Sequence, residues 1–419
     1  MSREPRLPGR RRWRRALDRL VVLRGPGADA ARQSLVALVL NSTTSIVAGA
    51  VLGAITGTLE RLPGLLVLVP AAIGLRGNVF SALGNRLSTS IHAGTFRLSF
   101  RVDTLLGQNI AAAMALTLSM SLLLAVVAKI VAVALGVANT ISVLDLALIS
   151  IVGGVLASLL VLIGTVLLAA GSVRYGWDLD NVTAPLVSTL GDVLTLPALW
   201  LATFLIEPDA VALVGGVVVV VAAAAALVLA WRTRLDLLRR IVRESAPILV
   251  VAGLLSTLAG VAIEKRIDTF ATYPALLVLV PAFISSAGAL GGVLSSRLST
   301  KLHLGLMGAE SFPPAAARGD AALVLVLAVP VYVFNAVGAH FVAEWLGQAS
   351  PGLSHMIPAA LLGGLSAVVF VVFVAYYGSV ASFRVGVDPD TYGIPVVTSS
   401  VDFVGAVALV VTIAALGLV

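Results

Sequence analysis

Long apolar runs make up most of the chain, and short polar stretches separate them. A helix needs about 20 apolar residues to cross a bilayer, and about eleven runs reach that length. The runs are continuous and do not alternate in polarity as the strands of a membrane barrel do. The pattern therefore predicts an all-α polytopic membrane protein. The expected spans are 34–57, 64–90, 105–135, 143–171, 181–205, 211–230, 246–263, 274–302, 321–346, 357–382 and 391–416.

Composition agrees with a membrane protein, since 59% of the 419 residues are hydrophobic and only 12% are charged. A soluble domain carries about 25% charged residues. The chain has no cysteine, which excludes disulfides and thiolate metal sites. The net charge of +7 comes largely from the ends of the spans, so it indicates orientation and not a nucleic-acid partner.

Lys and Arg are distributed unevenly between the two sides of the expected bundle. Residues 1–31 form a basic tail with the stretch RLPGRRRWRR, which we expect near anionic lipid at the cytoplasmic face. The loops that fall on the same side as this tail are basic, and the loops on the other side are acidic or mixed. With an odd number of spans, we expect a multi-pass plasma-membrane protein with a cytoplasmic N-terminus and an external C-terminus.

The chain contains an internal repeat. The stretch LLVLVPAAIGLRGNVFSALGNRLSTSIHAG at 65–94 aligns without a gap with LLVLVPAFISSAGALGGVLSSRLSTKLHLG at 276–305, an offset of 211. We expect two five-helix units, 32–205 and 243–419, joined by a linker at 206–242 that carries one extra span. Because the extra span returns the chain across the membrane, we expect parallel repeats around a pseudo-two-fold axis along the membrane normal.

Acidic residues recur at the same spacing in both units. The stretch GWDLDNVTAPLVSTLGD ends at Asp192, and GVDPDTYGIPVVTSSVD ends at Asp402, an offset of 210. Each acid should lie about 18 Å from the cytoplasmic surface, near the membrane midplane. Ser188 and Thr398 stand four residues earlier, on the same helix face. Two carboxylates facing each other across the axis, flanked by hydroxyl oxygens, predict a site for a hard cation such as Mg²⁺.

A structural alternative is that each aspartate neutralises a buried arginine, such as Arg76 or Arg86. Only Arg86 has an arginine at the matching position of the second unit, so symmetric pairing could use Arg86 alone. Asn78 follows a glycine in the middle of its span, and its match in the second unit is Ala289. Asn78 is therefore a candidate to orient a hydrated ion from one half only.

Four further acids, Asp178, Asp180, Asp388 and Asp390, stand where the last span of each unit begins. An Asp at that position caps free N–H groups at the helix start. The same acids could attract cations to a cytoplasmic mouth. No span carries a catalytic Ser/His pair, an HExxH signature or a Walker-type loop, so the sequence favours neither an enzyme nor a bound cofactor.

The motifs VPAAIGLRGN…RLSTSIHAG and DLDNVTAPLVSTLGD, with their second copies, resemble the MgtE superfamily of Mg²⁺ channels and transporters, most closely its solute carrier family 41 branch. The resemblance covers nearly everything from residue 32 onward. It implies units of five helices whose fifth helix carries a pore aspartate that binds Mg²⁺. By position that role falls on Asp192 and Asp402. MgtE is a homodimer, whereas both halves are present here, so we expect a functional monomer.

These observations predict a transporter of divalent cations in the lipid bilayer, with Mg²⁺ as the transported ion and Na⁺ as a candidate coupling ion. The alternative within transport is a proton-coupled carrier of another solute, with the same two aspartates as proton carriers. The sequence does not distinguish a channel from an exchanger.

Overall fold

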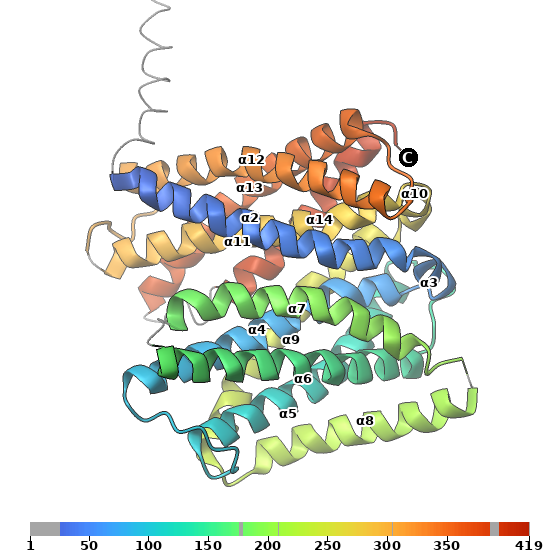
Figure 1. The fold of residues 1–419 in the computed structure, drawn as a ribbon, viewed down its shortest axis with the longest axis vertical. Helices are drawn as coiled ribbons and strands as arrows, with labels where there is room; N and C mark the ends of the chain where they lie inside the picture. The colour runs from blue at the N-terminus through green and yellow to red at the C-terminus, as the bar shows by residue number, and fades with distance from the viewer. Residues whose placement is uncertain (1–25, 176–178, 208, 304, 386–393, 419) are drawn as a thin grey trace, which may run out of the picture.

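The computed structural model describes residues 26–175, 179–207, 209–303, 305–385 and 394–418. These residues form long helices with short connections and no strand, so the prediction of an all-α polytopic membrane protein is confirmed (Figure 1). The helices of the first half are α2 (Pro26–Ala54), α3 (Thr56–Arg61), α4 (Leu65–His92), α5 (Leu105–Ala134), α6 (Val143–Tyr175) and α7 (Leu179–Thr203). Then come α8 (Asp209–Arg232), α9 (Asp236–Glu264), α10 (Ile267–Thr272), α11 (Pro274–His303), α12 (Ala315–Trp345), α13 (Leu353–Val385) and α14 (Ile394–Ala415).

Each expected apolar run corresponds to one long helix. In the described part of the chain, ten helices are long and apolar enough to cross a membrane. The remaining long helix is α7, in which the apolar stretch that the structure describes, Thr189–Thr203, is shorter than a membrane span. Figure 1 shows the start of α2 and the C-terminus at opposite ends of the bundle.

The first helix of each half packs against the other half. Helix α2 makes its most extensive contacts with α11, and α9 packs on both α4 and α5. Two tight contacts recur at the repeat offset: Gly49 of α2 lies against the carbonyl of Val278, and Gly260 of α9 lies against the carbonyl of Val67. A side chain at either glycine would collide with backbone, so glycine is what lets these helices approach so closely.

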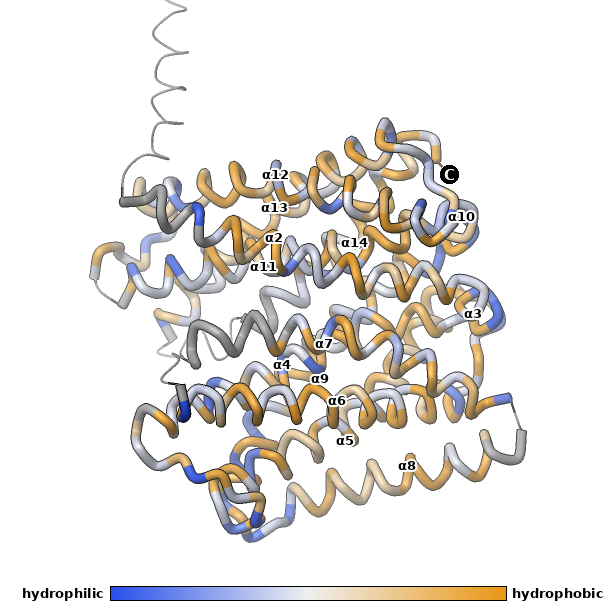
Figure 2. The backbone as a smooth tube through the Cα atoms, in the orientation of Figure 1, coloured by the Kyte–Doolittle hydropathy of each residue, from blue (hydrophilic) through white to orange (hydrophobic). Residues whose placement is uncertain are grey.

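Helix α8 lies at the edge of the bundle and has no counterpart in the second half. It packs on α5 and α6, and most of its surface is uncovered by the rest of the protein (Figure 1). Most of its exposed side chains are apolar, including Val214, Val218 and Leu229, and Figure 2 shows the hydrophobic colour along the helix. Such a face suits contact with lipid chains, in which a helix satisfies its own backbone polar groups.

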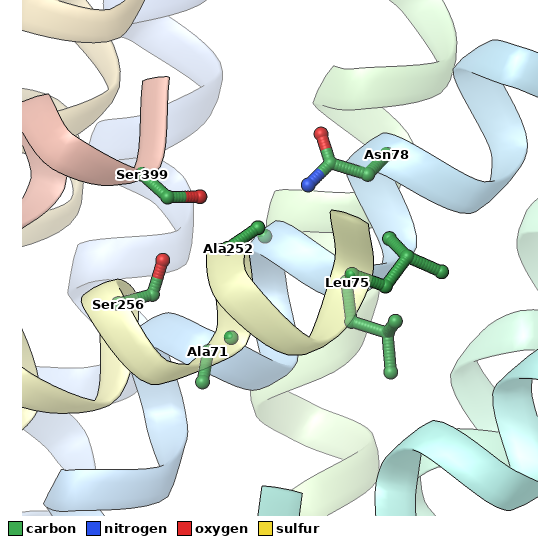
Figure 3. A pocket seen from close by; sticks show the side chains of 9 residues that line it. Ala71, Leu75, Asn78, Ala252, Ser256 and Ser399 are labelled. Carbon is green, nitrogen blue, oxygen red and sulfur yellow. The ribbon is translucent and has the colours of Figure 1, made fainter. Parts of the chain in front are cut away.

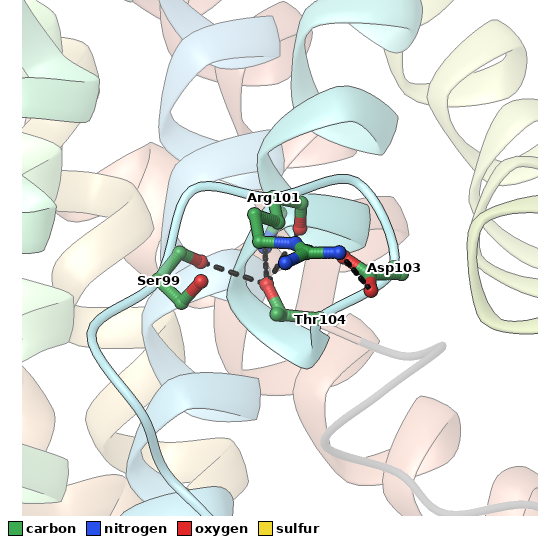
Figure 4. A network of polar contacts seen from close by, with 5 residues as sticks. Ser99, Arg101, Asp103 and Thr104 are labelled. Atoms are coloured by element: carbon green, nitrogen blue, oxygen red, sulfur yellow. Dashed lines mark hydrogen bonds and ion pairs between the residues drawn. The ribbon is translucent and has the colours of Figure 1, made fainter.

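The connection between α4 and α5 is held by local hydrogen bonds. The hydroxyl of Thr104 accepts from the N–H of Gly107, which caps the start of α5, and donates to the carbonyls of Ser99 and Arg101 (Figure 4). Arg101 also pairs with Asp103 at 3.2 Å. Both partners of this ion pair are exposed, so it adds little stability, and the Thr104 cap sets where the helix begins.

Candidate functional site

Asp192 lies in the middle of α7 and is buried where three helices meet. Its Oδ2 accepts a hydrogen bond of 3.2 Å from Ser45 of α2 and one of 3.5 Å from Ser285 of α11. Because α11 belongs to the second half, Asp192 sits at the interface of the two halves. Hydroxyl donors stabilise a carboxylate that burial would otherwise disfavour.

Asp402 of α14 has the same relationship in the second half. Its Oδ2 accepts a hydrogen bond of 2.8 Å from Ser256 of α9, and Ser256 is the repeat counterpart of Ser45. The counterpart of Ser285 is Gly74 of α4, where an added Cβ would lie 4.0 Å from Asp402 Oδ2. Thus each half presents a helix to the acid of the other half: α11 brings the hydroxyl of Ser285 to Asp192, whereas α4 brings Gly74, which has no side chain, to Asp402.

Helix α4 passes close to both acids: an added Cβ at Gly74 would lie 4.0 Å from Asp402 Oδ2, and one at Gly191, the residue before Asp192, would lie 3.6 Å from the N of Gly77. Among the described residues, no ion pair joins either acid to a basic side chain. Two neighbouring carboxylates without a positive partner are costly inside a membrane protein, and this cost falls when a cation binds between them.

The arginine alternative does not hold in the structure. The buried guanidinium of Arg76 donates to the carbonyl of Ala72 and to Ser121 of α5. Arg86 donates to Asn109 at 2.8 Å. Both arginines therefore bind neutral oxygens on α4 or α5, and neither neutralises Asp192 or Asp402.

A narrow cavity adjoins Asp402, and we call it the central cavity. Among the residues that line it are Gly74 and Asn78 of α4, Ser256 of α9 and Ser399 of α14. Figure 3 shows the polar ends of Asn78, Ser256 and Ser399 around this space. The sequence selected Asn78, which lines this cavity together with Ser399 and with Ser256, the hydroxyl donor to Asp402.

The other predicted site residues are described only in part. Thr398 lies on α14, half-buried, one residue before the cavity-lining Ser399. Ser188 and Asp180 belong to helix α7, but their side chains lie outside the described residues. Asp178, Asp388 and Asp390 also lie outside the described residues.

Sequence reasoning did not select Ser45, Ser256 or Ser285. Hydroxyl side chains are common in membrane helices, where they often bond within their own helix. A signal was nevertheless present, because Ser45 and Ser256 stand at the repeat offset of 211. Their partners lie far away in the sequence, on the last helix of each unit, so only the fold reveals the bond.

In the described part of the chain, no group of three or more His, Cys, Asp or Glu side chains gathers as a metal centre would require. Asp192 and Asp402 provide two carboxylates, and the surrounding hydroxyl and amide groups provide neutral oxygens. Such a set suits a hard cation that keeps part of its water shell, and it is poor for a tightly caged metal.

The chain matches the MgtE family, described as divalent cation transporter, over residues 69–202 and 280–412. It is also 24% identical over 374 residues to solute carrier family 41 member 3 of Rattus norvegicus, covering 84% of this chain and 81% of the relative. Identity to solute carrier family 41 member 2 of Xenopus laevis is 25% over 410 residues, 91% of this chain and 71% of the relative. Because the family match covers more than half of its length, the chain belongs to the MgtE family of divalent cation transporters.

The two matched regions fall at corresponding places in the sequence repeat, which agrees with the expected relationship between this chain and the solute carrier family 41 proteins. Families of this kind are transporters and not enzymes. The coarse prediction, a multi-pass membrane protein that transports divalent cations, is therefore confirmed.

Proposed function

We propose that this protein transports Mg²⁺ and that Asp192 and Asp402 form one binding site for it between the two halves. The observation that carries the proposal is the repeated hydrogen bond from Ser45 to Asp192 and from Ser256 to Asp402. A buried acid within a membrane helix is usually functional or paired, and neither acid has a described basic partner. Ser285 of the second half also donates to Asp192, and this contact across the boundary favours one shared site over two separate ones.

The chemistry of the site suits a divalent ion. Two carboxylates supply a charge of about −2, which matches one divalent cation in a setting of low dielectric constant. Mg²⁺ prefers oxygen ligands and gives up its water reluctantly. Asn78, Ser188 and Thr398 are proposed to hold the water shell, so the ion needs no complete protein cage.

We base the proposed unit boundaries and the proposed membrane orientation on the sequence repeat and on the distribution of Lys and Arg. We propose units at 32–205 and 243–419 with 206–242 between them, and a basic tail at 1–31 on the cytoplasmic side of the plasma membrane. In this orientation Asp178, Asp180, Asp388 and Asp390 lie at the cytoplasmic mouth and concentrate cations there. Both halves of the site come from one chain, so we propose a functional monomer, with Na⁺ as the candidate coupling ion.

A proton-coupled carrier of another solute is the second candidate. The observation in its favour is that Asp192 is buried and accepts two hydroxyl hydrogen bonds, an arrangement in which a carboxyl can exchange a proton. This mechanism predicts flux driven by a pH gradient and insensitive to Mg²⁺.

Ion flux into liposomes that contain the purified protein separates these functions. Mg²⁺, Na⁺ and pH gradients are imposed one at a time, and internal Mg²⁺ is followed with an indicator dye. We expect uptake that depends on the Mg²⁺ gradient. A pH-driven flux that ignores Mg²⁺ would refute the proposal and support the proton-coupled carrier.

A further inference from the structure

The seam between α4 and α9 contains a second cavity, of about 270 Å³, which we call the end cavity. Its lining includes Ala82 and Arg86 of α4 and Arg240, Glu244 and Ser245 of α9. The end cavity and the central cavity share Asn78 and Leu249 as lining residues. The two cavities therefore adjoin at these two side chains.

One face of α4 borders both cavities. Gly74, Asn78, Ala82 and Arg86 follow each other at intervals of four residues, which places them in one inclined row on the helix surface. The row begins at Arg86, at the end of the bundle that also carries Arg240, and we call this the basic end. It runs about 18 Å from there to Gly74, next to Asp402. This is the depth that separates a membrane surface from the midplane.

The equivalent seam, between α2 and α11, is bridged by hydrogen bonds in the part that the structure describes. There Asn41 and Ser285 bond to each other, with Asn41 Nδ2 lying 3.1 Å from Ser285 Oγ. Their repeat counterparts in the α4–α9 seam, which we call the open seam, are Ala252 and Gly74. These two residues have no side chain that can form a hydrogen bond, and both line the central cavity. The same two positions therefore carry a hydrogen bond across the α2–α11 seam and no hydrogen bond across the α4–α9 seam.

A second pair of positions shows the same difference between the two seams. Ser42 of α2 lies 3.1 Å from Ser286 of α11, and Asn335 of α12 donates to Ser286 at 2.8 Å. The counterparts of Ser42 and Ser286 are Gly253 and Leu75, which form no such bond. Hydrogen bonds between buried side chains hold helices together, so the α2–α11 seam resists opening more than the α4–α9 seam does.

The basic end of the open seam carries charged groups that are already engaged. Arg86 donates to Asn109 of α5, and Arg240 pairs with Glu244 at 2.8 Å. Between this end and Asp402, Asn78 lines both cavities, and its amide oxygen suits a hard cation. The hydroxyls of Ser245, Ser256 and Ser399 also line the two cavities. The central cavity has no room for a water molecule, so α4 and α9 must separate there before a hydrated ion passes.

We propose that the cation reaches Asp402 through the α4–α9 seam alone, along Gly74, Asn78 and Ala82, and that the α2–α11 seam is a closed, structural one. The proposal rests on the proposed transport of Mg²⁺ through the site of Asp192 and Asp402. It makes the two halves unequal: one half's acid faces the passage, and the other's is held by two hydroxyls.

Cysteine accessibility tests the proposal, because the chain has no cysteine of its own. Ala82→Cys places a thiol in the open seam, and Val293→Cys places one at the repeat counterpart on α11. Each variant is treated in liposomes with a membrane-impermeant cationic methanethiosulfonate, and labelling and Mg²⁺ uptake are both measured. We expect Ala82→Cys to be labelled and its uptake to fall by about tenfold, because the attached cation obstructs and repels the ion.

Val293→Cys should remain unlabelled, with uptake unchanged. Equal labelling and equal block at both positions would mean two equivalent passages and would overturn the proposal. So would an Ala82→Cys variant that escapes labelling or keeps its uptake when labelled. If the cysteine-free protein shows no Mg²⁺ uptake, the proposed function fails, and labelling alone still decides whether only the α4–α9 seam is open to water.

A second variant introduces the hydrogen-bonded pair of the α2–α11 seam into the α4–α9 seam. Gly74→Ser with Ala252→Asn copies the Ser285–Asn41 pair into the open seam, where an added Cβ at Gly74 meets only ordinary contacts. We expect this double variant to keep or raise its thermal stability and to lose Mg²⁺ uptake, while an added Ala82→Cys, which lies between the basic end and the new pair, is still labelled. A stable double variant with full uptake would contradict the proposal.

Discussion

Gly49 and Val278 touch through their backbones across the boundary between the two halves, and Gly260 and Val67 repeat this contact. Both contacts involve the first helix of one half and the second helix of the other. These helices carry Ser45, Ser256 and Ser285, the hydroxyls that reach the acids of α7 and α14, so the contacts fix how the serine-bearing helices lie relative to one another.

The first prediction concerns this packing. Gly49→Ala and Gly260→Ala should each lower the free energy of unfolding by at least about 2 kcal/mol, because the new methyl group meets a carbonyl of the facing helix. Thermal unfolding of the purified protein in detergent measures the effect. The control is Gly292→Ala in α11, where nothing lies within 4 Å of the added Cβ and the change should be neutral or stabilising. Equal stability of all three variants would show that the helices are not so closely packed.

The second prediction concerns the hydroxyls. Among the described residues, Ser256 is the side chain that donates to Asp402, whereas Asp192 has both Ser45 and Ser285. Ser256→Ala should therefore cut Mg²⁺ uptake by about tenfold, the size expected for one hydrogen bond to a charged group. Ser45→Ala should have a smaller effect, because Ser285 remains.

Uptake by the two serine variants is compared with Ser295→Ala, which removes a buried hydroxyl of α11 that has no hydrogen-bond partner in the structure. Ser295→Ala should transport normally. A larger loss for Ser45→Ala than for Ser256→Ala would show that the hydrogen bonds do not control the acids as inferred.

The third prediction uses a difference between the halves. Asp320 of α12 pairs with Arg297 at 2.9 Å and with Lys301, both on α11. The counterparts of Asp320 and Lys301 in the first half are Asn109 and Ser90, so the same site is neutral apart from its arginine. Asp320→Asn alone should cost about 2–4 kcal/mol of stability, because it leaves two cations without a carboxylate and they are only partly screened by solvent.

Adding Lys301→Ser to Asp320→Asn recreates the arrangement of the first half and should recover a large part of the loss. A double-mutant cycle on thermal stability measures this coupling. Additive losses would show that Lys301 and Asp320 do not act as a pair.

The fourth prediction concerns orientation. Single cysteines at Ser2 and at Leu418 should react with an impermeant thiol reagent from opposite sides of the membrane, since we propose eleven spans between them. The reagent is applied to intact and to permeabilised cells, with the cysteine-free protein as the background control. Reaction of both from one side would remove a span and, with it, the parallel arrangement of the repeats.

Much of the fold follows from the continuous apolar runs and the internal repeat. Local hydropathy fixes where a helix can cross a bilayer, so each expected run appears as a long helix. The sequence did not predict the short helices α3 and α10. It also did not predict that α2 and α9, the first helix of each half, pack against the other half. They depend on contacts between distant segments, although the glycines at 49 and 260 already stood at the repeat offset.

The site was only partly predictable for a similar reason. Asp192 and Asp402 stand out because a carboxylate in an apolar run is rare. Ser285 does not stand out, since a lone hydroxyl carries no such signal and its distance to Asp192 depends on how α11 meets α7. The difference between Gly74 and Ser285 is visible in the sequence, but its meaning as space beside one acid needs the fold.

The central claim is that Asp192 and Asp402 form one divalent site, and Mg²⁺ uptake by single and double Asn variants tests it most directly. Asp192→Asn and Asp402→Asn should each lose most of the uptake, since one carboxylate leaves half of the ion's charge uncompensated. The double variant should be little worse than either single one, because both changes disable the same unit. The protein should still fold, and the rise in its thermal stability on adding Mg²⁺ should shrink in parallel. Near-normal uptake by the single variants, or losses that multiply in the double variant, would contradict a shared site.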